Sequence, residues 1–241
     1  MNNQNSVRIN KFLSERGPYS RRAIDKLINE KRILVNGKHI KLGFKVNSDD
    51  EIKIDGEIIN KSKKRKKNIY LIFNKPAGIE CTTNQKINNN IIDFIGFPQR
   101  IFPIGRLDKD SEGLIFLTND GEIVNKILRS ENNNEKEYIV QVNRKITSDF
   151  LSNMSKGVKL KNINTKPCQT KKINNYTFKI ILTQGLNRQI RRMCHLFDYK
   201  VKSLVRTRII NINLGSLKLG RFRKFLPNEL EGLNKILDKS L

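Results

Sequence analysis

The amino-terminal residues carry two helical patterns followed by short strand-like patterns. Residues 9–13 place Ile, Phe and Leu at i, i+3 and i+4, which predicts the apolar face of a short helix. Gly17-Pro18 ends that helix because proline cannot continue its hydrogen bonding, and Ser20 is a typical N-cap for a second helix. Asn36-Gly37 separates two β-like stretches and is typical of a hairpin turn. We therefore predict a small αα-β domain over residues 6–60.

Residues 61–67 (KSKKRKK) are nearly all positively charged. Like charges repel one another and nothing in this run could pack, so we interpret it as an extended basic linker. A solvated tether and an arm that contacts RNA fit the pattern equally well. Both interpretations place a domain boundary here.

Residues 68–241 mix strand and helix patterns. Strands are predicted at residues 69–73, 114–117, 138–142, 178–182 and 201–214, and helices near residues 122–129, 188–197 and 228–237. Strands do not alternate strictly with helices. This order favours an α+β fold, with a mixed and mostly antiparallel sheet flanked by helices, over a doubly wound parallel sheet.

The charge balance changes the picture of possible partners. The 241 residues include 48 Lys and Arg against 23 Asp and Glu, a formal net charge of +25. This excess favours a polyanionic partner, RNA or DNA, although codon usage rich in A and T could explain part of it. Self-repulsion also favours a monomer. No apolar run approaches the ~20 residues that a bilayer requires.

Cysteine usage and the first residues indicate the compartment. Three cysteines and two histidines are scattered along the chain without any CxxC pair, so we expect neither a metal site nor a disulfide scaffold. Free thiols suit a reducing cytoplasm. The first six residues lack the profile of a signal peptide. We therefore expect a cytoplasmic protein that makes no membrane contact.

Asp108 is the first candidate for chemistry. It lies in a polar stretch between Gly105-Arg106 and the predicted strand at residues 114–117. Nearby arginines favour the ionised form of a carboxyl group, which would be available as a nucleophile, a base or an electrostatic stabiliser. Taken alone, an aspartate in a loop is more often a turn or cap residue.

The second candidate segment is residues 183–197 (TQGLNRQIRRMCHLF). On a helix its apolar residues form one buried stripe, which comprises Ile190, Met193, Cys194 and Phe197. Arg188, Arg192 and His195 then project from the opposite side, and Arg191 lies near the boundary, where it can reach a carboxylate. Such a density of arginines calls for anions, either an internal carboxylate or RNA phosphates. An ordinary amphipathic helix with a solvated basic face is the alternative.

Two further residues have weaker signals. Tyr138 at the start of a predicted strand offers a flat face to a base and a hydroxyl group for proton transfer, although packing is the commoner role. Lys75 precedes Pro76 and Gly78 in a predicted tight turn, where its ammonium group could meet a phosphate.

In this order, these segments resemble the pseudouridine synthases of ribosomal RNA, specifically the RsuA/RluB/RluE/RluF group. The matching motifs are Asn74-Lys75-Pro76 with Gly78, Gly105-Arg106-Leu107-Asp108, Glu137-Tyr138 and Gln189-Ile190-Arg191-Arg192-Met193. The resemblance covers residues 69–225, and within the group it is greatest to the RluF type, which acts on large-subunit ribosomal RNA. The amino-terminal unit is similar to an S4 RNA-binding domain.

The resemblance implies roles for individual residues. Asp108 would be the essential carboxylate, Arg191 would pair with it, and Tyr138 would stack on the flipped uracil with Ile190 packed beside it. Arg106 and Lys75 would support the site or bind a nearby phosphate, Arg188 and Arg192 would contact the substrate, and Arg8, Arg21, Arg22 and Lys26 of the S4 domain would contact RNA. No cofactor or metal is implied. Activity that depends on a basic carboxy-terminal tail is not expected, because the chain ends soon after its last predicted helix.

The implied activity is isomerisation of a uridine in 23S ribosomal RNA, in free RNA or in a pre-ribosomal particle. Alternatives are a synthase for small-subunit ribosomal RNA or transfer RNA, and an RNA-binding assembly factor without catalysis. A glycosidase using Asp108 and Asp110 is disfavoured, because alternate residues of a strand point to opposite sides and no tryptophan platform accompanies them.

Overall fold

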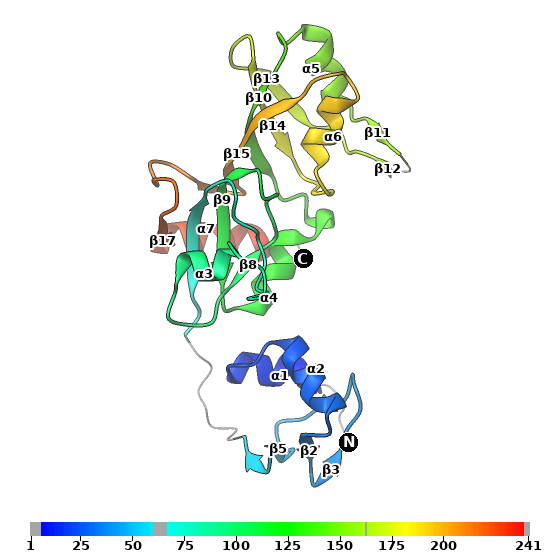
Figure 1. Ribbon diagram of the computed structural model, residues 1–241, viewed down its shortest axis with the longest axis vertical. Helices are drawn as coiled ribbons and strands as arrows, with labels where there is room; N and C mark the ends of the chain where they lie inside the picture. Colours follow the sequence, from blue (N-terminus) through cyan, green and yellow to red (C-terminus); the bar gives the residue numbers. More distant parts are fainter. Residues whose placement is uncertain (1–5, 60–66, 162, 239–241) are drawn as a thin grey trace. The chain divides into compact units, whose positions relative to one another are not determined.

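The computed structural model describes residues 6–59, 67–161 and 163–238 (Figure 1). Its contacts separate the chain into two compact units, Met1–Asn68 and Ile69–Leu241. Of the predicted linker at residues 61–67, only Lys67 lies within the described residues, and residue 60 of the predicted first domain also lies outside them. None of the helices that the structure describes is both long and apolar enough to span a bilayer.

Unit 1 begins with two helices, α1 (Ile9–Arg16) and α2 (Arg21–Asn29). The hydroxyl oxygen of Ser20 accepts a hydrogen bond from the backbone N–H of Ala23 at 3.0 Å, as its predicted role as N-cap requires. Ile9, Ile24 and the other apolar residues of the two helical faces are buried in one cluster.

The rest of unit 1 is β-structure. A four-stranded antiparallel sheet has the order β3-β2-β5-β6, and a separate pair joins β1 to β4. The bounds are β1 (Val7–Arg8), β2 (Ile33–Val35), β3 (Lys38–His39), β4 (Lys45–Val46), β5 (Ile52–Ile54) and β6 (Glu57–Ile58). Asn36 and Gly37 both have positive φ, 49° and 75°, which is the backbone that a tight two-residue hairpin needs.

Unit 2 is built around a sheet of nine strands whose main order is β13-β14-β10-β15-β9-β7-β17, with β8 beside β9 and β16 beside β15. All its pairs are antiparallel except β15 with β9, so the predicted α+β class and mostly antiparallel sheet are confirmed. The bounds are β7 (Tyr70–Lys75), β8 (Phe102–Ile104), β9 (Glu112–Thr118), β10 (Lys136–Val142), β13 (Gln169–Lys172), β14 (Thr177–Leu182), β15 (Val201–Ile209), β16 (Ile212–Asn213) and β17 (Phe222–Lys224).

Helices flank both ends of this sheet. Figure 1 shows α5 and α6 beside β10 and β14, and α3, α4 and α7 beside β7 and β9. The remaining bounds are α3 (Ile91–Ile95), α4 (Gly121–Leu128), η1 (Ser130–Asn132), α5 (Ser148–Ser155), α6 (Gln189–His195) and α7 (Pro227–Asp238), with a small hairpin of β11 (Lys159–Leu160) and β12 (Ile163–Asn164).

The middle strands are apolar on both faces, which explains the continuous apolar runs in the sequence. Leu71 and Ile115 belong to the cluster that also contains residues of α3, α5 and α6. Ile72 and Phe116, one residue further along each strand, belong to the cluster that contains residues of α4 and α7. Burial on both faces fixes the register of β7 and β9, and with it the position of the loop that precedes β9.

The two halves of the sheet meet at Gly113, where β9 pairs in parallel with β15. Gly113 has φ 101°, and a Cβ atom there would lie 2.3 Å from the carbonyl oxygen of Arg206. Only glycine permits this approach. The close contact brings the start of β9, and therefore the loop before it, against β15.

Two predicted elements differ from the structure. The single strand predicted at residues 201–214 is wrong, because Ile210 has φ 52° and the chain reverses there into β16. The helix predicted near residues 188–197 is shorter, since Arg188 has left-handed φ and ψ of 48° and 35° and α6 begins after it. Its predicted stripe is nevertheless buried at Ile190, Met193 and Cys194.

Candidate active site

Asp108 lies in the loop of residues 105–111, between β8 and β9, and this loop is fixed through its backbone. The Lys75 ammonium group, at the end of β7, donates hydrogen bonds to the carbonyl oxygens of Ser111 (2.8 Å) and Lys109 (3.2 Å). The backbone N–H of Gly78 donates to the same Lys109 carbonyl at 2.8 Å. The segment that follows β7 therefore holds the Asp108 loop at several points.

Of the two roles expected for Lys75, support of the site or contact with a phosphate, its hydrogen bonds fit the first. Its side chain is fully buried, and its third hydrogen bond goes to the carbonyl oxygen of Pro76 at 2.8 Å. Burial lowers the pKa of this ammonium group, and Cys81, Glu112 and Asp108 act in the opposite direction. Because all three N–H donors are used inside the fold, Lys75 supports the loop and has no donor left for RNA.

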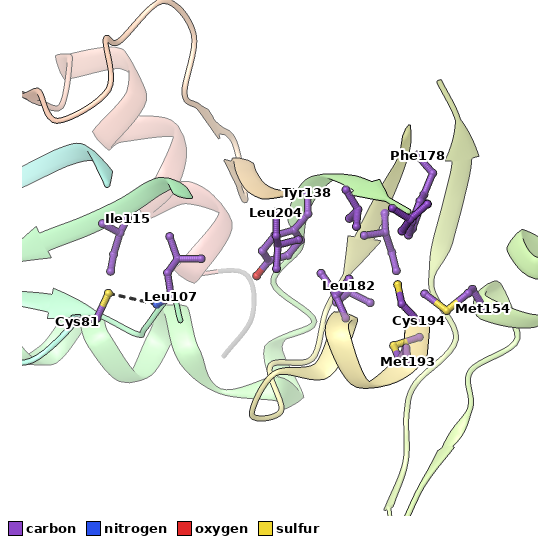
Figure 2. Packing of buried hydrophobic residues seen from close by; sticks show 14 of the residues in the cluster. Cys81, Leu107, Ile115, Tyr138, Met154, Phe178, Leu182, Met193, Cys194 and Leu204 are labelled. Carbon is purple, nitrogen blue, oxygen red and sulfur yellow. Dashed lines mark hydrogen bonds between the residues drawn. The ribbon is translucent and has the colours of Figure 1, made fainter. Parts of the chain in front are cut away.

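Cys81 holds the loop from a second side. Its sulfur accepts a hydrogen bond from the backbone N–H of Leu107, the residue before Asp108, at 3.3 Å (Figure 2). Burial raises the pKa of the Cys81 thiol above its usual value, so the acceptor is the neutral thiol near neutral pH. This contact was not predicted, because the sequence around a lone cysteine does not show whether its side chain is buried.

The side chain of Asp108 is 24% exposed and lies beside two guanidinium groups from the α6 segment. Its Oδ2 atom lies 3.8 Å from Nε of Arg191 and 3.8 Å from Nη1 of Arg188. Both contacts are short enough for ion pairs but too long for hydrogen bonds. Two guanidinium groups therefore face one partly exposed carboxylate.

Arg191 is anchored independently of that carboxylate. Its Nη2 atom donates to the carbonyl oxygen of Asp110 (3.1 Å) and to the hydroxyl oxygen of Ser111 (3.2 Å), and Nη1 donates to the carbonyl oxygen of Val201 (3.4 Å). One guanidinium group thus joins α6, the Asp108 loop and β15. Its planar fork fixes the distance between these three segments.

Tyr138 lies on β10 and is only 9% exposed. In Figure 2, Tyr138 and Leu204 lie between two parts of the buried cluster, one with Cys81, Leu107 and Ile115 and the other with Leu182, Met193 and Cys194. Ile190 belongs to the same cluster. The structure therefore brings Tyr138, Ile190 and the residue next to Asp108 into one packed group.

Two buried cations beside Tyr138 were not singled out from the sequence. The guanidinium carbon of Arg206 lies 5.9 Å from the centre of the Tyr138 ring, its Nε atom donates to the carbonyl oxygen of Leu114 at 2.6 Å, and its Nη2 atom is buried without a hydrogen-bond partner. Lys136 is 8% exposed, and burial, with a smaller effect of Arg206, lowers its pKa to about 8. The sequence did contain one signal for these two residues, since each is a basic residue within a strand pattern that is otherwise mostly apolar.

The remaining predicted contact residues are at the surface. Arg106 and Arg188 are exposed, and Arg192 is half-buried beside the pocket formed by the α6 segment. In unit 1, Arg8, Arg21, Arg22 and Lys26 are all exposed, and Lys26 forms an ion pair with Glu30 at 3.5 Å. These positions are accessible to a polyanion.

The expectation that Asp108 and Asp110 point to opposite sides of a strand is wrong. Asp108 and Asp110 lie in a loop and not on a strand, and Nη1 of Arg188 lies within 3.8 Å and 3.7 Å of their Oδ2 atoms. Strand alternation therefore does not separate them. Among the described residues, no group of three or more His, Cys, Asp or Glu side chains is arranged to hold a metal ion.

Comparisons with known proteins identify both units. Residues 69–196 match the RNA pseudouridylate synthase family, and residues 7–52 match the S4 domain family. The dual-specificity RNA pseudouridine synthase RluF of Escherichia coli (strain K12) is 47% identical over 98% of this chain and 81% of its own length.

Two further relatives agree with this result. The ribosomal large subunit pseudouridine synthase B of Bacillus subtilis (strain 168) is 33% identical over 96% of this chain and 97% of its own length. A crystal structure of a pseudouridylate synthase is 27% identical, with a TM-score of 0.70 over 95% of this chain and 100% of that one. The resemblance seen in the motifs is confirmed: the chain belongs to the RNA pseudouridylate synthase family and carries an S4 domain.

Proposed function

We propose that this protein isomerises a specific uridine of 23S ribosomal RNA, in the large subunit, with Asp108 as the essential carboxylate. The observation that carries this proposal is the placement of Asp108 beside Arg191 and Arg188, 3.8 Å from each, in a loop fixed by the fold. Two relatives, named RluF and ribosomal large subunit pseudouridine synthase B, support the choice of RNA.

The proposed reaction can proceed with a single carboxylate. The N1–C1′ glycosidic bond of uridine breaks, the uracil turns, and a C5–C1′ bond forms. C5 then loses a proton and N1 gains one, so atoms and electrons balance within one nucleotide. The reaction therefore needs neither a redox partner nor a nucleotide energy source.

The target base must leave its stack before it can reach Asp108. Base flipping costs a few kcal/mol, and an aromatic face together with basic groups around the RNA backbone offsets that cost. Tyr138 and Ile190 are proposed to contact the flipped uracil from the buried side of the site. The Tyr138 hydroxyl group is a candidate acceptor for the proton that leaves C5.

Asp108 then acts in one of two ways. In the first, its carboxylate attacks the sugar or the base and forms a covalent intermediate. In the second, it removes a proton from the sugar. Both require a carboxylate in a fixed position, and Arg191 and Arg188 lie within ion-pair distance of it.

RNA is proposed to be held by both units. In unit 1, Arg8, Arg21, Arg22 and Lys26 are exposed in the region that matches the S4 domain family. In unit 2, Arg106, Arg188 and Arg192 are candidates for phosphate contacts around the flipped nucleotide. Because 48 Lys and Arg face only 23 Asp and Glu, we propose that the protein is a monomer in the absence of RNA.

The name of the E. coli relative favours a second candidate substrate. That relative is called a dual-specificity enzyme, so we propose that this protein also acts on a second RNA, with transfer RNA as the class to test first. Both reactions would use the same site. The three cysteines are free thiols, which supports action in a reducing cytoplasm.

The test is a map of pseudouridine in ribosomal and transfer RNA from cells with and without the gene. We expect at least one site in 23S ribosomal RNA to disappear with the gene, to return with the intact protein, and to stay absent with Asp108→Asn. An unchanged map, or a site restored by the variant, would contradict the proposal. Loss of sites only in small-subunit or transfer RNA would correct the substrate and leave the activity standing.

A further inference from the structure

A pocket beside the Asp108 site is lined mainly by basic side chains. It has a volume of about 330 Å³, and its lining includes Arg188, Arg191, Arg192, His195 and Lys200 but no acidic residue. Arg188 and Arg191 also lie 3.8 Å from Oδ2 of Asp108. The pocket and the Asp108 site therefore share two guanidinium groups.

The other basic residues of this pocket are not neutralised by the fold. Within the described part of the chain, the side chains of Arg192, His195 and Lys200 make no hydrogen bond or ion pair. Clustered cations repel one another, and an anion in the pocket would remove that repulsion. This arrangement points to an anionic ligand.

Two of the residues that line the pocket, Tyr199 and Arg191, are held in place by the fold. Tyr199 donates its hydroxyl to the carbonyl oxygen of Lys145 at 3.0 Å and stacks on Phe150, with ring centres 4.0 Å apart and planes at 26°. Arg191 is tied to the backbone of Asp110 and to the Ser111 hydroxyl. A preformed shape lowers the cost of ordering on binding.

We propose that this pocket binds one phosphodiester group of the substrate RNA, directly beside the nucleotide that enters the Asp108 site. The inference rests on the proposed function. A phosphate held by Arg192, His195 and Lys200 would set the register of the strand, while the base is handled at Asp108 and Tyr138. The shared Arg188 and Arg191 keep the two positions within reach of one nucleotide step.

The first test measures how RNA binding depends on salt. In vitro transcribed ribosomal RNA is the probe, with the full-length protein and its Arg192→Gln, Lys200→Gln and double variants. Each single variant should weaken binding about tenfold and reduce the slope of log K against log salt by roughly 1. Lys171→Gln is the matched control, because Lys171 is exposed on the edge strand β13 and does not line the pocket.

Thermal unfolding of each variant shows that it is folded. Equal slopes and affinities for the Arg192, Lys200 and Lys171 variants would overturn the proposal. If the Arg192 and Lys200 variants lost binding to inorganic phosphate but bound RNA as the wild type does, the proposal would also be overturned, because the ligand of the pocket would then be a free anion.

The second test locates the phosphate. Methylphosphonate linkages neutralise one phosphate at a time on either side of the mapped uridine in a synthetic RNA. At one position the RNA change and the Arg192→Gln/Lys200→Gln change should not be additive, because both remove the same contact. Additive losses at every position would refute the site. Coupling without pseudouridine formation would instead leave the pocket standing and reject the isomerase proposal.

Discussion

Nε of Arg191 lies 3.8 Å from Oδ2 of Asp108, while the other two nitrogens of the same guanidinium group donate hydrogen bonds elsewhere. Nε itself is buried and has no hydrogen-bond partner. Arg191 therefore fixes the Asp108 loop through Asp110 and Ser111, and it acts on the carboxylate by charge. Arg191 therefore leaves the lone pairs of this carboxylate without a hydrogen bond.

This dual role predicts that charge alone will not replace Arg191. Lysine at this position keeps the positive charge but cannot bond to Asp110, Ser111 and Val201 with one planar group. A shift of about 1 Å in a reacting group can cost on the order of a hundredfold in rate. We expect Arg191→Lys to lower kcat by about that factor in single-turnover assays, with similar RNA affinity. A kcat equal to that of the wild type would show that the fork is not needed.

The hydrogen bond from Leu107 to Cys81 makes Cys81 a positioning residue. Cys81→Ala leaves a buried N–H group without an acceptor, at a cost of about 1–3 kcal/mol in the free energy of unfolding. We expect kcat to fall about tenfold while KM changes little, because the loop moves but the RNA contacts remain.

Cys81→Ser provides the control, since its hydroxyl oxygen can accept the same hydrogen bond. It should recover most of the lost kcat. Equal loss in the serine and alanine variants would assign the effect to packing instead of to the hydrogen bond.

The parallel contact between β9 and β15 predicts a severe effect of one methyl group. Gly113→Ala would place a Cβ atom 2.3 Å from the Arg206 carbonyl oxygen, at a φ of 101°. We expect the variant to lose more than about 4 kcal/mol in urea unfolding, or not to fold. Gly185→Ala is the matched control, because nothing lies within 4 Å of its added Cβ atom. Similar stabilities of the two variants would contradict the close approach.

Lys136 predicts a pH dependence of stability. Burial lowers its pKa to about 8 from the ordinary 10.5. The unfolded chain therefore binds this proton more tightly than the folded chain does. The resulting loss of folding stability is fully present below about pH 8 and disappears as the pH rises through about 10.5. Lys136→Met removes the charge, and the methionine side chain has nearly the same shape as that of lysine. This variant should have a higher Tm near neutral pH.

The gain in Tm should shrink at about pH 9.5, where the wild-type side chain is largely neutral when folded. Lys171→Met, at an exposed position, should show no such trend. A gain that is constant across this pH range would mean that the Lys136 ammonium group is not desolvated.

Local sequence patterns predicted much of the fold. The apolar spacing of α2 and its Ser20 cap, the Asn36-Gly37 turn and the buried stripe of α6 depend on neighbours in sequence. The reversal of the chain between β15 and β16 does not depend on sequence neighbours alone. Ile210 holds a positive φ because its N–H donates to the Glu135 carbonyl oxygen and its own carbonyl accepts from Arg208, contacts that the tertiary fold creates.

The site shows the same division. The motif order identified Asp108, Tyr138 and Arg191, and the fold does bring Asp108 and Arg191 together. Residue type alone could not show that Lys75 faces three carbonyl groups inside the protein instead of RNA. It also could not reveal Arg206 and Lys136 beside Tyr138, since their burial follows from strand pairing between β10 and β15.

The carboxylate of Asp108 is proposed to perform the chemistry and not to hold the RNA. The most direct measurement is single-turnover pseudouridine formation by purified Asp108→Asn, with RNA affinity measured on the same preparation. We predict binding within about twofold of wild type, since the residue lies among cations and its charge does not attract phosphate, and no detectable product. Pseudouridine formed at a rate near that of the wild type would contradict the account.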